Sequence, residues 1–335
     1  MTARIPTGVA TGIGSMPGTD PREAVAVIAG EVALPFLPEL PARGVGGDLI
    51  GRAAGLLTGI PVDYVHRTYR LSASPTAETR RARDYLRWDL DALEEHWERR
   101  GLVGSVEVLK IQACGPFTVA AHVELRGGHK AVRDRGALYD IAESLAAGLV
   151  EQAEEVQRRI GVRVVVQLDE PSIGEVIDGT VTPLTRLDPI APVPVHDVAE
   201  TLETFAAQVA RPVLLHSCAV PRWELFARLP SYGLALDFTR LRARDYDPLG
   251  EILDAGRVVA AGVVPAVDPG LAPERIADDL ADRLAGLGDR MGMPRSMFGE
   301  QFLVTPVCGL AGATPSWARR ALAIASAVAD AVTGA

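Results

Sequence analysis

Short apolar segments rich in β-branched residues alternate with helical segments along the whole 335-residue chain. Several are apolar at nearly every position, as expected of parallel strands that are buried on both faces. Eight strands are predicted, at residues 9–15, 31–39, 105–114, 162–170, 212–218, 232–238, 257–264 and 301–308. Eight strand-then-helix units favour a (β/α)8 TIM barrel, and an open doubly wound α/β sheet is the alternative.

The segments between the predicted strands carry the signals of helices. Asp20 and Thr314 are predicted N-caps, because each is followed by a proline at the first helical position. The segment "APERIADDLADRLAGLGDRMG" has one apolar stripe at helical spacing, formed by Ile276, Leu280, Leu284 and Leu287. Further helices are predicted near residues 47–58, 78–99 and 136–160.

No linker divides the sequence, so residues 1–335 are expected to form a single barrel domain. Two connections are longer than the others, residues 40–104 and residues 171–196. Long connections that follow barrel strands lie over the active-site mouth. Both are therefore predicted to be long loops or cap insertions over the C-terminal mouth.

Composition limits the kinds of partner. The net charge is −9 and the pI about 5.3, which argues against a nucleic-acid groove. No apolar stretch approaches the length of a membrane span, and the first residues lack a signal-peptide core. Three cysteines far apart in the sequence do not make a disulfide framework. We therefore expect a cytoplasmic protein that binds neither nucleic acid nor membrane.

Polar residues gather where the predicted strands end, which is the functional face of a barrel. These residues are Ser15, Glu39, Cys114, Asp169, Glu170, His216, Cys218, Asp237 and Cys308. Cys114 is interpreted as a small buried apolar residue. The others are candidates for a site at the barrel mouth.

The pattern His216-x-Cys218 places an imidazole and a thiol on one face of a strand, since side chains two apart point the same way. Cys308 and Asp237 end other strands at the same mouth. Two thiolates, one imidazole and one carboxylate form a plausible zinc ligand set. The sequence therefore predicts a Zn²⁺ site at these four residues.

Four segments, "TGIGSMPGT", "VVVQLDEPSI", "LLHSC" and "LVTPVCGLAGAT", are similar to segments of cobalamin-independent methionine synthase, in the order of its C-terminal catalytic barrel. The resemblance covers nearly the whole chain and implies a short, single-barrel form. The wider superfamily includes coenzyme M methyltransferases and uroporphyrinogen decarboxylase.

The resemblance also implies roles for particular residues. It assigns His216, Cys218 and Cys308 to zinc, with Asp237 where the family generally has Glu. It implies that Asp169, with Glu170 in the same "DEP" segment, binds the substrate amino group. The amino-acid end of the substrate is expected at Ile13, Gly14 and Ser15, with Glu39 as a second carboxylate.

Two departures from the family concern the methyl donor. The family has an acid–base His after its seventh strand, where this chain has Val267 followed by Asp268. Asp268 is therefore given only the role of a proton carrier. The aromatic segment that helps the family to hold a folate is not recognisable.

The expected activity is a zinc-dependent transfer of a methyl group to a thiol, with homocysteine as acceptor and methionine as product. The donor is expected to be a methylated folate or a methyl-corrinoid protein. One alternative is a metal-free decarboxylase of the uroporphyrinogen type, which would need arginines near the N-terminus; Arg43 and Arg52 are the nearest. Another is a non-catalytic barrel that binds a metal or a ligand.

Overall fold

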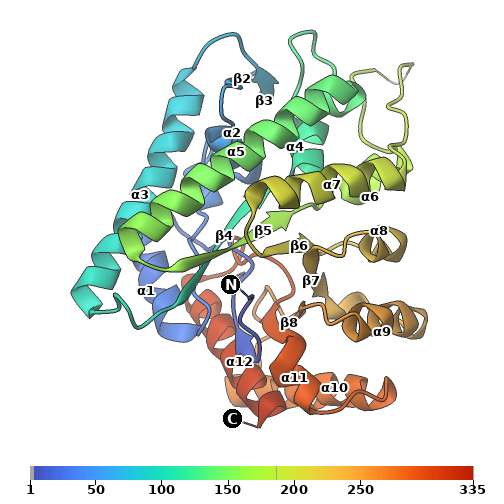
Figure 1. Ribbon diagram of the computed structural model, residues 1–335. Coiled ribbons are helices and arrows are strands. Elements are labelled where there is room, and N and C mark those ends of the chain that lie inside the picture. The colour runs from blue at the N-terminus through green and yellow to red at the C-terminus, as the bar shows by residue number, and fades with distance from the viewer. Residues whose placement is uncertain (1–3, 186, 335) are drawn as a thin grey trace.

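Seven parallel strands form one curled sheet in the computed structural model, which describes residues 4–185 and 187–334 (Figure 1). The order across the sheet is β1-β9-β8-β7-β6-β5-β4, and each neighbouring pair is parallel. The strands are β1 (Val9–Ala10), β4 (Val108–Cys114), β5 (Arg163–Asp169), β6 (Val213–Ser217), β7 (Tyr232–Asp237), β8 (Val259–Val264) and β9 (Phe302–Pro306). The predicted α/β class is confirmed, although the seven strands do not close a barrel.

The predicted strand at residues 31–39 is wrong as a regular strand, because the segment makes only isolated bridges. Pro35 and Pro38 interrupt it, and proline has no N–H for a ladder. The segment nevertheless lies between the two edge strands. Leu34 N donates to Ala10 O at 3.2 Å on one side, and Leu37 N donates to Lys110 O at 2.9 Å on the other.

One apolar cluster lies on each side of the curled sheet. The larger lies between the strands and the helices that pack against them. The smaller lies on the inner side of the curl and takes one residue from each of β4 to β9 and one from the 31–39 segment: Leu34, Val108, Val165, Leu214, Ala235, Ala260 and Leu303. Burial on both faces explains why the strand sequences are almost wholly apolar.

Twelve α-helices of the described residues surround the sheet (Figure 1). They are α1 (Pro21–Glu31), α2 (Leu49–Leu56), α3 (Ala77–Arg100), α4 (Pro116–His122), α5 (Arg135–Ile160), α6 (Ile173–Asp178), α7 (Val195–Val209), α8 (Trp223–Ala227), α9 (Tyr246–Asp254), α10 (Pro273–Arg290), α11 (Ser296–Gln301) and α12 (Pro315–Thr333). Both predicted N-caps are confirmed. Asp20 accepts from Arg22 N at 2.8 Å, and Thr314 accepts from Trp317 N at 3.1 Å.

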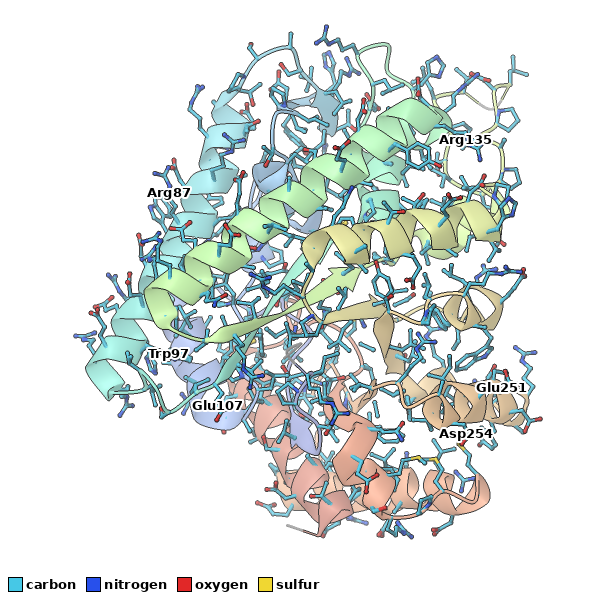
Figure 2. All side chains as sticks on the ribbon, viewed as in Figure 1. Arg87, Trp97, Glu107, Arg135, Glu251 and Asp254 are labelled. Carbon is cyan, nitrogen blue, oxygen red and sulfur yellow. The ribbon has the colours of Figure 1, made fainter. Side chains whose placement is uncertain are left out.

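The helices bury one face and expose the other, as their periodicity requires. On α3, Trp97 is buried in the core, whereas Arg87 projects to the outside (Figure 2). None of the helices in the described part of the chain has an apolar stretch long enough to cross a bilayer.

The connection at residues 40–104 holds α2, α3 and an antiparallel hairpin of β2 (Val62–Val65) and β3 (Thr68–Leu71). The hairpin was not predicted, because its turn lacks the usual Gly or Asn. His66 and Arg67 adopt positive φ angles of 51° and 68° in their place. The connection at residues 171–196 holds α6.

Candidate metal and substrate site

Three of the predicted metal ligands come together at the carboxyl edge of the sheet. One ligand atom from each of His216, Cys218 and Cys308 lies within 4.8 Å of the others. His216 is near the end of β6, Cys218 follows it, and Cys308 follows β9. The two sulfur atoms lie 3.4 Å apart. Since the carboxyl ends of parallel strands meet at one edge, residues from distant parts of the chain converge there.

The imidazole of His216 is buried and held in a defined orientation. Its Nδ1 donates to the carbonyl oxygen of Ala235 on β7 at 3.1 Å. This bond fixes the tautomer and leaves Nε2 as the nitrogen with a free lone pair. Metal-binding histidines usually donate their second N–H to such an acceptor.

The cluster fits a tetrahedral zinc ion in donor type and spacing. Two thiolates at the usual zinc–sulfur distance on a tetrahedral ion are about 3.8 Å apart, close to the 3.4 Å of Cys218 and Cys308. The neighbouring Cys308 thiol and His216 lower the pKa of Cys218, whereas Cys218 and burial raise the pKa of Cys308. Burial opposes the charged form of His216, but Cys218 and Asp169 outweigh it and raise its pKa. The thiolate of Cys218 therefore forms readily beside the imidazole of His216, and a bound cation would favour the thiolate form of Cys308 as well.

Asp237, the fourth predicted ligand, lies outside this group. Its Oδ1 accepts from Thr239 N at 3.0 Å and from Thr239 Oγ1 at 2.5 Å, and its Oδ2 pairs with Arg240 Nε at 3.2 Å. The carboxylate thus caps the 3-10 turn η3 (Phe238–Arg240). The Asp237 carboxylate makes its hydrogen bonds and its ion pair within the turn that follows it. The structure therefore brings together three of the four predicted ligands.

Asp169 ends β5 next to His216, since the two residues are partners in the β5–β6 pairing. Its Oδ1 accepts from Gln167 Nε2 at 2.7 Å, and the same nitrogen donates to the carbonyl oxygen of Ile13 at 2.7 Å. Burial raises the pKa of Asp169, while His216 and Lys110 oppose the rise. The structure therefore connects Asp169 both to the metal-ligand cluster and to the predicted substrate segment.

Glu39 is buried beside the Gly14–Ser15 segment. Its N donates to Gly14 O at 3.0 Å, and Met16 N donates to Glu39 O at 2.8 Å. The nearest cation is Arg52, with Nε 3.5 Å from Glu39 Oε1, and no described residue donates a hydrogen bond to Oε1. Burial raises the pKa of Glu39 to about 7; Asp169 adds to the rise, and Arg52 opposes it.

The segment from Ile13 to Ser15 packs against its neighbours without spare space. A Cβ on Gly14 would lie 2.6 Å from Gln112 Cγ, so only glycine fits. A Cβ on Gly309 would lie 2.0 Å from Ser15 Oγ, and Leu310 N donates to Ser15 O at 2.8 Å. The predicted substrate segment therefore touches the backbone that follows Cys308.

Two other predicted residues have different surroundings. Glu170 is fully buried, and its carboxylate accepts from Phe117 N at 2.9 Å, Thr118 N at 2.8 Å and Thr118 Oγ1 at 2.6 Å. It anchors the N-terminus of α4, and burial raises its pKa to about 7. Asp268 is exposed after β8, where it pairs with Arg320 and accepts from Gly270 N at 2.8 Å. The structure brings neither carboxylate into the cluster.

Three interior residues were missed by sequence reasoning: Lys110, Gln112 and Gln167. Lys110 Nζ donates to Ile13 O at 3.0 Å and to Gln112 Oε1 at 3.3 Å, and Gln112 Nε2 donates to Leu37 O at 2.5 Å. The sequence does contain an indication of these buried polar residues, because they interrupt otherwise apolar strands, at alternate positions in "VLKIQAC" and at one position in "VVVQLD".

A curled parallel sheet with an imidazole and two thiols at its carboxyl edge defines the class of a barrel-like enzyme with a candidate metal centre. The comparisons with known proteins narrow this class. Residues 6–331 match the sequence model of the family described as cobalamin-independent synthase, catalytic domain. The chain belongs to this family, and the resemblance noted from its four segments is confirmed. The family indicates an enzyme of the methyltransferase or methionine synthase type that acts on small molecules.

Two solved structures share the fold. A methyltransferase from Methanosarcina mazei is 16% identical, with a TM-score of 0.55, and the match covers 99% of this chain and 94% of that chain. A B12-independent methionine synthase from Shewanella sp. W3-18-1, in complex with selenomethionine, is 13% identical, with a TM-score of 0.57 and 97% of each chain covered. A search of curated proteins gives no significant match.

Proposed function

We propose that this protein is a zinc-dependent methyltransferase that transfers a methyl group to the sulfur of homocysteine and so forms methionine. The observation that carries the proposal is the group formed by His216, Cys218 and Cys308 within 4.8 Å, at the edge of the sheet where Asp169 also ends. Family membership supports methyl transfer as the reaction type.

Zinc is the proposed cofactor, held by His216, Cys218 and Cys308. When bound, it would supply the Lewis acidity that keeps a substrate thiol in the thiolate form near neutral pH. Asp237 remains the fourth ligand implied by the resemblance, and to act as one it would have to leave Thr239 and Arg240.

The chain's own residues would bind and orient the amino-acid end of the acceptor. We propose that the carboxylates of Asp169 and Glu39 bind the substrate ammonium. The remaining atoms of the amino-acid end of the substrate would contact Ile13, Gly14 and Ser15. Burial of these groups supports the assignment, because a water-excluded site strengthens the attraction between a carboxylate and an ammonium. Holding the acceptor sulfur at a fixed position relative to the donor methyl lowers the entropic part of the barrier.

The proposed donor is a methylated folate or a methyl-corrinoid protein. Asp268 is proposed only as a proton carrier near the donor, because it is exposed in the loop after β8. Glu170 is proposed to act on the substrate only through the position of α4, since its oxygens already accept three hydrogen bonds.

We also propose that the described residues, 4–185 and 187–334, belong to one barrel-like domain, in which the 31–39 segment takes the place of an eighth strand and the two long connections lie over the mouth. Hydrogen bonds from this segment to Ala10 and Lys110 support the proposal. It predicts slow hydrogen exchange at the amide of Leu37, whereas exchange at the rate of an unstructured loop would contradict it.

The central test combines zinc analysis with turnover. Protein purified without chelator should contain about one zinc ion per chain by elemental analysis. It should convert homocysteine to methionine, detected by mass spectrometry, with methyltetrahydrofolate or methylcobalamin as donor. Chelation should abolish turnover, and added zinc should restore it. Absence of zinc from protein prepared in zinc-containing medium would overturn the proposal.

The alternatives are less well supported. A decarboxylase of the uroporphyrinogen type needs arginines that are available to several carboxylates, but both Arg43 and Arg52 donate to the buried Asp89, at 2.7 Å and 2.5 Å. A non-catalytic binding barrel would bind zinc or an amino acid but would transfer no methyl group. The turnover measurement separates that alternative from the proposed enzyme.

A further inference from the structure

Lys110 is a charged side chain with no access to solvent, on the inner side of the curled sheet. It is one of only two lysines in the chain, the other being Lys130. Its Nζ donates to the carbonyl oxygen of Ile13 at 3.0 Å and to Gln112 Oε1 at 3.3 Å. Burying an ammonium is costly unless nearby charges and hydrogen bonds compensate for the lost water.

The charges nearest to Lys110 are the two carboxylates proposed to bind the substrate ammonium. Burial lowers the pKa of Lys110 to about 8, and the charges of Asp169 and Glu39 oppose that fall. Lys110 therefore still carries its proton at neutral pH.

The other charges around Glu39 are already engaged. Arg52 on α2 lies 3.5 Å from Glu39 but donates its hydrogen bond to Asp89 on α3. Asp89 also accepts from Arg43, so its charge is compensated by two arginines. Burial raises the pKa of Glu39 and Asp169 on β5 adds to the rise, whereas Arg52 lowers this pKa and Lys110 on β4 lowers it to a smaller extent. Lys110 therefore favours the ionised form of Glu39 together with Arg52.

We propose that Lys110 is a positioning residue of the amino-acid site, whose ammonium holds the Ile13 carbonyl in place and supplies positive charge near the carboxylates of Asp169 and Glu39 that would receive an incoming ammonium ligand. The inference rests on the proposed function and narrows its substrate class. The site would select thiols and thioethers that carry a primary ammonium over analogues that lack one.

The first test is calorimetric titration of the zinc-loaded protein with L-methionine between about pH 6 and about pH 8, the range set by the pKa values of Glu39 and Lys110. L-Methionine has no thiol, so it adds no thiol proton to the measurement. Affinity should rise with pH as Glu39 ionises. The analogue 4-(methylthio)butanoate, which lacks the ammonium, should bind at least about tenfold more weakly, equivalent to one pKa unit of differential interaction.

The variants K110M and K110R separate charge from shape. K110M should bind L-methionine about tenfold more weakly near pH 6, and this deficit should shrink as the pH approaches 8, because Glu39 then ionises without help. K110R keeps the positive charge and should retain the wild-type pH profile. A K110M deficit that is the same at every pH would show a merely structural role and would overturn the inference.

A second measurement needs only the native protein and remains informative if K110M does not fold. Labelling with 15Nζ-lysine gives two signals, which a K130R variant assigns. L-Methionine should shift the Lys110 signal and lower its pKa, because a second ammonium enters the same carboxylate site. Lys130, which is partly exposed and pairs with Glu124, is the internal control. An unchanged Lys110 signal on saturation with L-methionine would overturn the inference, whereas no binding of L-methionine at any pH would contradict the proposed function itself.

Discussion

The sulfur atoms of Cys218 and Cys308 lie 3.4 Å apart although 90 positions separate the two residues in the sequence. The parallel sheet brings them together, because β6 and β9 end at the same edge. We expect C308S to lower zinc affinity by more than the roughly 10–100-fold that loss of an outer-shell partner costs, because a soft thiolate ligand is removed. Chelator competition measures this loss.

C114A is the matched control for C308S. Cys114 is buried at the end of β4 and lies outside the cluster of ligand atoms in the described residues. The C114A variant should therefore bind zinc with the same affinity as the wild type. Equal zinc affinity in C308S and the wild type would remove Cys308 from the metal site.

For Asp237, in contrast to Cys308, we predict that substitution leaves zinc affinity nearly unchanged. Its carboxylate accepts from Thr239 and pairs with Arg240, so we expect D237N to retain zinc with an affinity close to that of the wild type. The weakened cap should instead destabilise the fold by about 0.5–2 kcal/mol. Urea unfolding and elemental analysis on the same preparation measure both effects. If D237N loses zinc as C308S does, Asp237 is a ligand, as the family resemblance implies.

The sequence predicted the parts of this molecule that follow from local pattern. Six of the eight predicted strands were found as strands of five residues or more, since apolar β-branched runs mark a doubly buried strand. His216, Cys218 and Cys308 were expected to meet because residues at the ends of parallel strands share an edge.

What could not be predicted depends on tertiary contacts. The 31–39 segment is apolar, but its prolines limit pairing to isolated bridges. The choice of Asp237 between its own turn and the cluster depends on a rotamer that no sequence pattern reveals. Lys110 is an exception to the rule that lysines are exposed, and its burial is accounted for by hydrogen bonds to Ile13 and Gln112 and by the nearby charges of Asp169 and Glu39.

The buried carboxyl of Glu39 predicts a dependence of stability on pH. Its pKa is about 7 in the folded protein, against 4.5 as the ordinary value. The folded state therefore binds the proton more tightly, so this group's contribution is fully present below pH 4.5 and is lost as the pH rises to about 7. In E39Q the free energy of unfolding should fall less steeply over this window, as measured by urea unfolding at several pH values.

The exposed Glu107 provides the control for that measurement, because its side chain is 80% exposed. E107Q removes one carboxylate without touching the interior. A slope for E39Q that matches those of the wild type and E107Q would show that Glu39 does not hold its proton in the folded state.

Helix packing offers a prediction that is independent of the site. A Cβ on Gly148 in α5 would lie 1.8 Å from the carbonyl oxygen of Leu56 in α2. A backbone oxygen cannot avoid this clash by rotation, as a flexible side chain could. We expect G148A to destabilise the protein by at least about 1–3 kcal/mol through overpacking. G250A in α9 meets nothing within 4 Å and should stabilise by about 0.5–1 kcal/mol. Equal midpoints of thermal unfolding for the two variants would contradict the close approach of α2 and α5.

The contact between Ser15 and Gly309 links the predicted substrate segment to the residue after Cys308. A Cβ on Gly309 would lie 2.0 Å from Ser15 Oγ but 3.3 Å from Ser15 Cβ. G309A should therefore destabilise the protein by about 1–3 kcal/mol and weaken zinc binding, because it displaces the backbone beside Cys308. In the S15A background the same substitution should cost less, since the hydroxyl is gone. A double-mutant cycle on unfolding free energy and zinc affinity measures this coupling. Additive effects would show that the two segments do not constrain each other.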